Sequence, residues 1–396
     1  MNAALLILNA GSSSLKFAIY LAGPANALQI RYRGVIEEIG REARFRLLHA
    51  ADAEDRVDRA VPAADHEQAL RHLLDWLHTR HPDLSLSAAG HRVVHGGADY
   101  IHPVRVDAVV LSDLEKLIPL SPLHQPHNLA GIRALARLRP DLPQVACFDT
   151  AFHHTLPPRA RRFALPRELD ERGIRRYGFH GLSYEHIAAV MPDYLGDAAA
   201  GRVVVAHLGN GASLCAMQHG RSVETSMGFT PLDGIPMASR CGALDPGVLL
   251  YLLREEGMSL DQLDDLLHHR SGLLGLSGIS GDVRVLQASD DPHAAEALDL
   301  FAYRTSQAIA SHAVALDGLD ALVFTAGIGE HAASVRAAIC RRLAWLGLEL
   351  DDAANHRHGP CISPPHSRIS VWVIPTNEEY VIARHAWALT ADERPT

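Results

Sequence analysis

The fold is decided near the N-terminus, by the stretch Leu5-Leu-Ile-Leu-Asn-Ala-Gly-Ser-Ser-Ser-Leu-Lys-Phe-Ala-Ile-Tyr20. Its two short apolar runs, at residues 5–8 and 15–20, are typical of buried strands. The small polar residues between them let backbone N–H groups point at one spot, which is how a phosphate is bound without a helix N-terminus. The hydroxyls of Ser12 and Ser14 and the ammonium group of Lys16 add donors that suit phosphate. The stretch predicts a phosphate-binding hairpin, although an ordinary hairpin with a polar turn would show the same pattern.

A second stretch repeats this pattern half a chain later. Residues 203–217 read Val-Val-Val-Ala-His-Leu-Gly-Asn-Gly-Ala-Ser-Leu-Cys-Ala-Met, again a strand, a loop of glycine and small polar residues, and a strand. Gly209 follows Gly11 by 198 residues in a chain of 396. Two such hairpins at this spacing predict a duplicated domain, in which each half provides one phosphate-binding loop.

Length and composition narrow the class of protein. A chain of 396 residues is too long for one core, so two domains are expected. The net charge of −9 argues against nucleic acid as a partner. No basic segment precedes the first apolar run and no apolar stretch is long enough to cross a membrane, so neither a signal peptide nor a membrane span is expected. The five cysteines are scattered without a C-x-x-C pair, which favours reduced thiols in the cytoplasm.

Charged side chains stand at the ends of predicted strands in the first half. Arg92 ends a strand within residues 88–97, and Asp149 follows the short apolar strand Gln144–Phe148. The carboxyl ends of strands are where α/β proteins place reactive groups. A domain boundary is expected near residue 150. His91 and His95 have the spacing of a metal pair but no evident third ligand, so no metal is expected there.

The second half adds a long loop and further helices and strands. Residues 225–240 are rich in turn residues and end in Arg240, and a loop of this length usually serves a function. Ser183 is predicted to cap a helix after the Tyr177–Gly181 turn. Helices are predicted at residues 65–80, 128–139, 247–256, 260–268 and 291–316. A buried strand beginning at Asp320 is followed by a tight Gly-x-Gly turn and a helix through Arg342. A strand within residues 370–380 ends in the paired carboxylates of Glu378 and Glu379, and a last helix runs to about Leu389.

Two other functions fit parts of this pattern. Gly327-Ile-Gly-Glu-His-Ala332 matches the G-x-G-x-x-A fingerprint of dinucleotide-binding proteins, with Glu349 and Asp351 about 20 residues further on. Against a dehydrogenase, the motif lies near the chain end, Glu330 adds a charge after the second glycine, and the two hairpins stay unexplained. An ATP-binding protein that changes shape without transferring phosphate would use the same hairpins, but it would not need a cluster of Arg92, Asp149, His180 and Arg240.

Six motifs together resemble those of the acetate kinases, in order and over residues 5–385. They are Asn9–Lys16, Gly90–Gly97, Cys147–His153, Tyr177–Gly181, His207–Gly211 and Phe324–Glu330. The resemblance implies an α/β fold of two duplicated actin-like ATPase (ribonuclease H-like) domains with an interdomain cleft, usually paired as a homodimer. It implies an N-terminal domain of residues 1–150 plus 383–396 and a C-terminal nucleotide-binding domain of residues 151–382.

The resemblance also implies a reaction and the residues that carry it. The expected reaction is reversible phosphoryl transfer between ATP and acetate, giving acetyl phosphate and ADP, and it consists mainly of positioning and charge neutralisation. The catalytic residues implied are Arg92, Asp149, His180 and Arg240. Arg92 also binds the carboxylate, and the pocket for the methyl group is implied to consist of Val94, Leu123, Phe179 and Pro231.

Nucleotide and metal sites follow from the same resemblance. The nucleotide-binding residues implied are Ser12, Ser14, Lys16, His207, Leu208, Gly209, Asn210, Gly211, Asp282, Val283, Arg284, Gly327, Ile328 and Gly329. Asn9 and Glu378 are implied to position Mg²⁺ or Mn²⁺, although Glu378 and Glu379 would also suit the first turn of a helix without any metal.

The chain departs from the family pattern in one place. After Gly-Ile-Gly-Glu the family usually has Asn-Ser, whereas this chain has His331-Ala332, which bears on nucleotide contacts more than on the chemistry. Propionate kinases share most of the motifs and butyrate kinases share several, so the acyl chain that the pocket accepts is left open.

Overall fold

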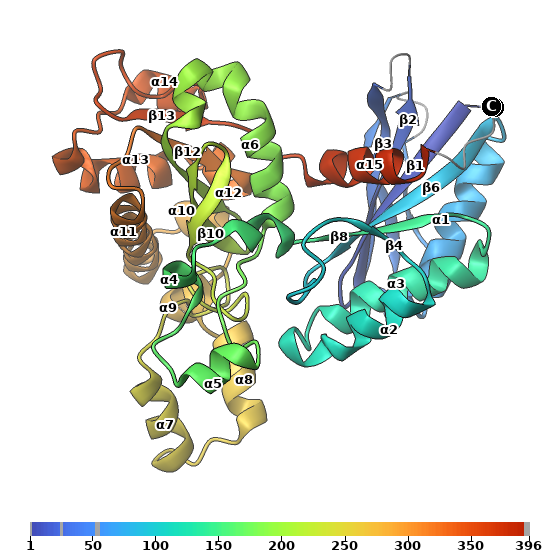
Figure 1. The fold of residues 1–396 in the computed structure, drawn as a ribbon, viewed down its shortest axis with the longest axis horizontal. Helices are drawn as coiled ribbons and strands as arrows, with labels where there is room; N and C mark the ends of the chain where they lie inside the picture. The colour runs from blue at the N-terminus through green and yellow to red at the C-terminus, as the bar shows by residue number, and fades with distance from the viewer. Residues whose placement is uncertain (1, 24–26, 52–55, 392–396) are drawn as a thin grey trace. The chain divides into compact units, whose positions relative to one another are not determined.

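The chain divides into two units in the computed structural model, which describes residues 2–23, 27–51 and 56–391 (Figure 1). Unit 1 is Met1–Ala151 with Asn377–Thr396, and unit 2 is Phe152–Thr376. The predicted return to the first domain at residue 383 is therefore wrong, because helix α15 (Glu378–Leu389) belongs entirely to unit 1. Of the segments assigned from the sequence to the first domain, residues 1, 24–26, 52–55 and 392–396 lie outside the described ranges.

Unit 1 is one sheet with helices on both faces. Its strands are β1 (Asn2–Ala10), β2 (Ser14–Ala22), β3 (Leu28–Glu37), β4 (Arg44–Ala50), β5 (Asp58–Ala60), β6 (Leu84–Val93), β7 (Val104–Arg105) and β8 (Gln144–Phe148). Its helices are α1 (His66–Arg80), α2 (Ala108–Lys116), α3 (Gln125–Leu138) and α15. The strand order is β5-β4-β3-β2-β1-β6-β8-β7, with β6 and β8 parallel to β1.

The predicted N-terminal hairpin is present. Strands β1 and β2 pair antiparallel from Ala4–Leu21 to Ala10–Leu15. Alternate residues of β1 point to opposite faces of the sheet, as the pleat requires. Leu6 and Leu8 join the core formed with α1 and α3, whereas Ile7 lies on the face that α15 covers. Both faces are therefore buried, which explains why these strands read as continuous apolar runs.

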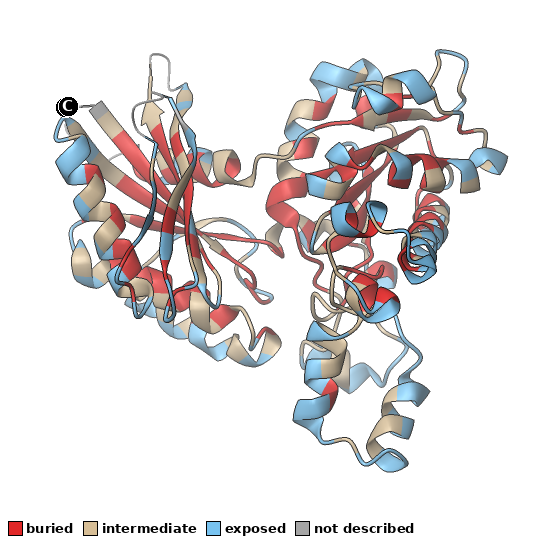
Figure 2. Cartoon of the chain, turned by 180° about the vertical axis from the view of Figure 1, so that it is seen from behind, coloured by how far each residue is buried: buried red, intermediate tan, exposed pale blue. Residues whose placement is uncertain are grey.

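Unit 2 contains a second sheet. Its strands are β9 (Arg202–Leu208), β10 (Ala212–Gln218), β11 (Arg221–Thr225), β12 (Ala321–Thr325) and β13 (Ser370–Val373). Its helices are α4 (Pro158–Arg161), α5 (Arg167–Glu171), α6 (Gly181–Leu195), α7 (Pro246–Arg254), α8 (Leu260–His269), α9 (Gly272–Ser277), α10 (Val283–Gln287), α11 (Pro292–Ala315), α12 (Ala326–His331), α13 (Ala333–Arg342) and α14 (Asp352–His356). In Figure 2 the buried residues concentrate on the sheet and on the helix faces turned towards it.

The two sheets share one plan. The order β11-β10-β9-β12-β13 in unit 2 matches β3-β2-β1-β6-β8 in unit 1, and in both an antiparallel meander is followed by strands parallel to its first strand. The β1–β2 and β9–β10 hairpins occupy equivalent places. This confirms the duplicated α/β architecture predicted from the two glycine-rich loops.

Two local predictions are wrong. Ser183 does not cap helix α6, since the cap is His180 in the left-handed conformation (φ 58°) and the helix begins at Gly181. Gly327 and Gly329 do not form a tight turn, because Ala326–His331 is itself the short helix α12. A dinucleotide fingerprint needs that turn and a mostly parallel sheet. In the described part of unit 2 the turn is absent, and β11, β10 and β9 pair antiparallel.

Close packing of α15 on β6 makes Gly90 intolerant of a side chain. A Cβ at Gly90 would lie 2.5 Å from Ile382 Cγ2 and 3.1 Å from Ile7 Cδ1. We expect Gly90→Ala to lower the free energy of unfolding by about 1–3 kcal/mol. The loss should appear as faster hydrogen exchange of the α15 amides and a lower urea midpoint. In an Ile382→Ala background, where Cγ2 is gone, the same change should cost less; an equal cost in both backgrounds would contradict this packing.

Candidate active site

The loop of the first hairpin is held from behind by two helices. Asn128 Nδ2 of α3 donates to the Ala10 carbonyl at 2.8 Å, and His66 Nε2 of α1 donates to the Gly11 carbonyl at 2.7 Å. The side chain of Ser12 stays exposed and that of Ser14 half-buried. A loop anchored through its carbonyls keeps its remaining hydroxyl donors in a fixed place, which suits an anionic ligand.

Arg92 and Asp149 form a bidentate ion pair at the edge where β6 and β8 end. The Arg92 guanidinium donates from Nε to Asp149 Oδ1 at 2.9 Å and from Nη2 to Oδ2 at 2.6 Å. Asp149 is 2% exposed. Because β6 and β8 are parallel neighbours, their carboxyl ends meet at one edge of the sheet, as expected from the sequence.

Glu378 joins this pair from the first turn of α15. Its Oε2 lies 3.9 Å from Arg92 Nε. Arg92 shares a face of β6 with Gly90, two residues earlier, and α15 covers that face. Asn9 is in register with Lys16 at the same end of β1. The structure thus brings Asn9, Lys16, Arg92, Asp149 and Glu378 to one edge of the unit 1 sheet.

Charge and burial compete in this cluster. Burial, together with the charges of Asp149 and Glu379, raises the pKa of Glu378 to about 7 against the opposing effect of Arg92 and Lys16. Burial opposes the charge of Arg92, but the carboxylates of Asp149 and Glu378 outweigh it and the pKa of Arg92 is raised. Glu378 is therefore protonated more readily than an exposed carboxyl group.

Other unit 1 predictions have simpler outcomes. Val94 is buried and its N–H donates to Asn128 Oδ1 at 3.0 Å, while Leu123 is half-buried before α3. His91 pairs with the Gln144 side chain and His95 Nδ1 accepts from the Gly97 N–H, so the two histidines serve the fold. Within residues 2–23, 27–51 and 56–391, no three His, Cys, Asp or Glu side chains are grouped to hold a metal ion.

The second hairpin brings two catalytic candidates against one glycine. A Cβ at Gly211 would lie 2.7 Å from Arg240 Nη2 and 3.1 Å from His180 Nε2. The loop is closed by a bond from the Gly209 N–H to the Gly211 carbonyl at 3.1 Å, and the Asn210 carbonyl accepts from the Ala238 N–H at 3.1 Å. Arg240 and His180 therefore lie directly on the loop, as a site for a phosphoryl group requires.

Arg240 is presented by the long loop between β11 and α7. Its Nη1 donates to the Pro231 carbonyl at 2.6 Å, and its own carbonyl accepts from the Met237 N–H at 3.0 Å. Arg176 Nη1 secures the start of the loop by donating to the carbonyls of residues 225, 226 and 227. Of the methyl-pocket residues expected in unit 2, Pro231 is half-buried in this loop and Phe179 is buried beside His180.

Two histidine–serine pairs link the β9–β10 hairpin to helix α6 and its cap. Strands β9 and β10 place His207 opposite Ser213, but each pairs with a residue of α6 or its cap. Ser213 Oγ lies 2.8 Å from His180 Nδ1, and Ser183 Oγ lies 2.8 Å from His207 Nδ1. The two imidazole rings stack at 4.1 Å with an angle of 17° between them. The stacking and the two serine contacts fix the positions of both imidazole rings.

The predicted adenosine segment lies next to this hairpin. A Cβ at Gly209 would lie 3.7 Å from Ala326 Cβ, whereas one at Gly327 would meet nothing within 4 Å. Arg336, which is fully buried, donates from Nη1 to the carbonyls of Gly329 and Glu330 at 2.8 and 2.9 Å. Burial lowers the pKa of Arg336 to about 10. Arg336 therefore holds α12 in place through the carbonyls of Gly329 and Glu330, while the space beside Gly327 is open.

Residues 282–284 are linked to the site through the Arg240 loop. Asp282 caps helix α10 and forms an exposed ion pair with Arg284 at 2.6 Å, which contributes little to stability. A Cβ at the preceding Gly281 would lie 2.7 Å from the Ala238 carbonyl. Unit 2 therefore gathers the second hairpin, His180, Arg240, α12 and the turn before α10.

Residues that orient the site were missed in the sequence. Asn128, Tyr184, Ser213 and Arg336 contact site residues from other elements, and none stands in a motif that points to its contact. Glu330 ends the sixth family motif, and its Oε1 accepts from the N–H groups of Ala326 and Thr376, a contact that the motif does not indicate. A single sequence gives no signal for such contacts, because they depend on which elements pack together.

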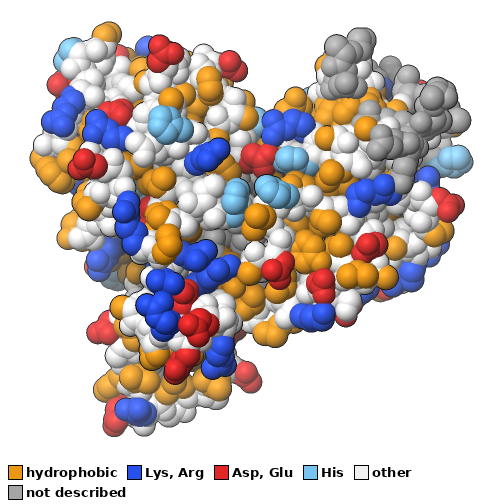
Figure 3. Space-filling model, viewed as in Figure 1, with side chains coloured by type: hydrophobic (Ala, Val, Ile, Leu, Met, Phe, Trp, Pro, Cys, Tyr) orange, Lys and Arg blue, Asp and Glu red, His pale blue; other side chains and the backbone are white. Residues whose placement is uncertain are grey.

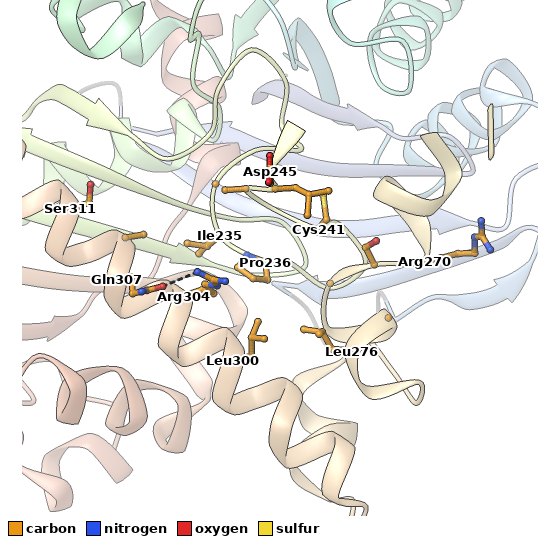
Figure 4. A pocket seen from close by; sticks show the side chains of 17 residues that line it. Ile235, Pro236, Cys241, Asp245, Arg270, Leu276, Leu300, Arg304, Gln307 and Ser311 are labelled. Carbon is orange, nitrogen blue, oxygen red and sulfur yellow. Dashed lines mark hydrogen bonds between the residues drawn. The ribbon is translucent and has the colours of Figure 1, made fainter. Parts of the chain in front are cut away.

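A cavity of about 820 Å³ in unit 2 is separate from these residues (Figure 4). Its lining includes Ile235, Cys241, Leu300 and Arg304, and none of the residues expected to bind nucleotide or acetate. On the face drawn in Figure 3, acidic and basic side chains are interspersed over both units. Among the helices of the described ranges, none has the length and apolarity needed to cross a bilayer.

Comparisons with known proteins agree with this architecture. The chain matches the model of the Acetokinase family over residues 4–384. It is 55% identical over 394 residues to an acetate kinase of Rhodopseudomonas palustris, covering 98% of this chain and 99% of that one. A propionate kinase of Citrobacter rodentium is 46% identical, covering 100% and 99%. The crystal structure of a propionate kinase from Francisella tularensis superposes with a TM-score of 0.91 at 37% identity, covering 98% and 99%. The chain belongs to the acetokinase family.

Proposed function

We propose that the chain is an acetate kinase, which transfers a phosphoryl group reversibly from ATP to acetate and yields acetyl phosphate and ADP. The observation that carries this proposal is the 55% identity to an acetate kinase over both full lengths. The positions of the charged side chains support it, since phosphoryl transfer depends on positioning and charge neutralisation. Acetate is already ionised at neutral pH, so the reaction needs no general base.

We assign the roles of the site residues unit by unit. In unit 1, Asp149 would hold the Nε and Nη2 edge of the Arg92 guanidinium, and the remaining Nη donors of Arg92 would grip an oxyanion. In unit 2, Arg240 and His180 would donate to the phosphoryl oxygens as charge spreads over them. The two hairpin loops would bind the phosphates of the nucleotide, and Gly327, Ile328 and Gly329 would face adenosine.

Mg²⁺, or Mn²⁺ in its place, would bind at Glu378 and Asn9. Oxygen donors suit both ions, and Mg²⁺ uses one or two carboxylates together with phosphate and water, so a dense group of protein ligands is not needed. The pKa of Glu378 is raised by its burial and by the neighbouring charges of Asp149 and Glu379, and a dication would offset both effects. The ion would neutralise the charge of the phosphates during transfer.

Propionate is the alternative substrate. A propionate kinase is 46% identical to the chain and another has a similar structure at 37% identity, both below the 55% of the acetate kinase. The pocket residues Val94, Leu123, Phe179 and Pro231 would exclude longer acids by clash, because a pocket rejects larger substrates more sharply than smaller ones. A non-transferring ATPase switch is the third candidate, and the Arg92–Asp149 pair argues against it.

A homodimer and a cytoplasmic location complete the proposal. Helix α7 has the sequence PGVLLYLLR, and none of its residues is buried. Val248, Leu250 and Tyr251 are 39%, 49% and 56% exposed. An apolar helix in this state commonly marks a protein–protein contact, and a second copy of the chain is the partner we propose for it.

The activity can be tested directly. With ATP, Mg²⁺ and one of acetate, propionate or butyrate, ADP release is followed by a coupled assay and the acyl phosphate is trapped with hydroxylamine. We expect acetate-dependent hydroxamate, with kcat/KM for acetate above that for propionate. ADP release that does not depend on any acid would favour the ATPase switch, and a preference for propionate would assign the alternative substrate.

Replacing the site arginines should abolish turnover and spare the fold. We expect Arg92→Lys, which keeps the charge but loses the fork, and Arg240→Ala to lower kcat by about 100-fold or more. Steady-state kinetics with both substrates saturating measures this, and circular dichroism checks the fold. The matched controls are the exposed Arg139→Ala in unit 1 and Arg221→Ala in unit 2, whose kcat should stay unchanged. Turnover within about threefold of normal in either site variant would refute the assignment.

Glu378 should make stability depend on pH in the metal-free chain. Its pKa is about 7 in the folded chain against an ordinary 4.5, so the folded state binds more protons between these values and its stability falls as pH rises from about 4.5 to 7. Glu378→Gln should remove this dependence and be more stable than the unaltered chain at pH 8, by at most about 3 kcal/mol.

Urea midpoints measured at several pH values give this difference. Glu67→Gln is the control, because Glu67 is paired with Arg71 and Arg137 on the surface of the same unit. A constant difference between Glu378→Gln and the unaltered chain from pH 4.5 to 8 would show that Glu378 is not the titrating group.

A further inference from the structure

A chain of buried hydroxyl groups leads to the His180 imidazole. Tyr184 Oη lies 2.5 Å from Ser213 Oγ, and Ser213 Oγ lies 2.8 Å from His180 Nδ1. Tyr184 and Ser213 are both 0% exposed, and His180 is 8% exposed. Tyr184 stands on α6, one turn after the His180 cap, and Ser213 is the second residue of β10. The three groups belong to one unit, so their geometry does not depend on how the two units are placed.

The hydrogen atoms in this chain have one satisfied arrangement. Among the residues that the structure describes, Ser213 is the only hydrogen-bond partner of Tyr184 Oη. If the Ser213 hydroxyl donated to the phenol, the phenol hydrogen would be buried without an acceptor, which is costly. The phenol therefore donates to Ser213, and the single hydrogen of Ser213 is left for His180 Nδ1.

We infer that Tyr184 and Ser213 act as positioning residues, which hold His180 in the tautomer that carries its proton on Nε2. This inference rests on the proposed role of His180 in phosphoryl transfer. Nε2 is the atom that lies against Gly211 beside Arg240. In the other tautomer Nε2 would present a lone pair to the phosphoryl oxygens and repel them, whereas an Nε2–H group donates to them.

The His207 ring, which stacks on His180, is also held by a hydroxyl group. Ser183 Oγ lies between His207 Nδ1 and Thr376 Oγ1, 2.8 Å from each. The two imidazole rings stack 4.1 Å apart, so each limits the rotation of the other. A fixed neutral donor at His180 therefore keeps its orientation through the reaction without having to exchange a proton.

Nitrogen NMR tests the tautomer independently of activity. The full chain, labelled with ¹⁵N in its histidine rings, is compared with His180→Gln to assign the His180 signals. We expect a neutral ring with the proton on Nε2 in the unaltered chain. Tyr184→Phe frees the Ser213 hydroxyl, and we expect a mixture of tautomers there. A proton on Nδ1 in the unaltered chain, or an unchanged tautomer in Tyr184→Phe, would overturn the inference.

Kinetics tests whether the tautomer matters. Ser213→Ala and Tyr184→Phe should lower kcat between about 10- and 100-fold, with KM for ATP and acetate changed less than about threefold. Ser222→Ala is the matched control, since Ser222 is equally buried and its Oγ lies 2.8 Å from Nδ1 of another buried histidine, His153.

The outcomes separate this inference from the proposed function. An equal loss of kcat in Ser222→Ala and Ser213→Ala would mean that Ser213 acts only through general packing, and it would overturn the inference. Full activity in His180→Gln would refute the proposed role of His180. The hydrogen bonds from Tyr184 and Ser213 would then serve no catalytic purpose, whichever tautomer they hold. Activity lost in His180→Gln but kept in Ser213→Ala and Tyr184→Phe would leave the proposed function standing and overturn this inference alone.

Discussion

Parallel pairing of β1 with β6, and of β9 with β12, is the constraint on which both halves of the candidate site depend. A parallel neighbour ends at the same edge at which the hairpin turns, so the residues after β6 and β12 lie beside the two glycine-rich loops. In unit 1 this places Arg92 near the first loop. In unit 2 it places helix α12 next to Gly209. The same parallel pairing in the two units therefore places a set of polar groups at equivalent positions in each.

Two buried charged groups near these edges have their hydrogen bonds satisfied by the surrounding structure. Asp149 is matched by the fork of Arg92, and Arg336 is matched by carbonyls at the end of α12 and by Asn355. An unpaired group in either place would cost several kcal/mol. Such networks also fix geometry, because a side chain with all its bonds made has one rotamer. This is the property that phosphoryl transfer requires of its donors.

Glycine has a specific purpose at two of these positions. Gly90 lets α15 approach β6 closely enough for Glu378 to reach Arg92, and Gly211 lets Arg240 and His180 lie on the hairpin backbone. Both requirements come from neighbours far away in the chain. The sequence motifs around them were recognisable as a set, but the reason for each glycine became visible only with the contacts.

The sequence by itself determined the duplication, the two hairpins, the main helices and the family, because apolar periodicity and glycine-rich loops are local signals and six motifs in order are specific together. It placed Arg92 and Asp149 at strand ends, and the structure joined them. It misplaced the cap of α6 at Ser183 and the return of the chain at residue 383, and it passed over Tyr184, Ser213 and Arg336. Only the tertiary structure decided these points, since a hydroxyl or guanidinium takes its role from the partners that packing brings within 3 Å: Ser213 reaches Tyr184 and His180 from 29 and 33 residues away, and Arg336 reaches Asn355 from 19.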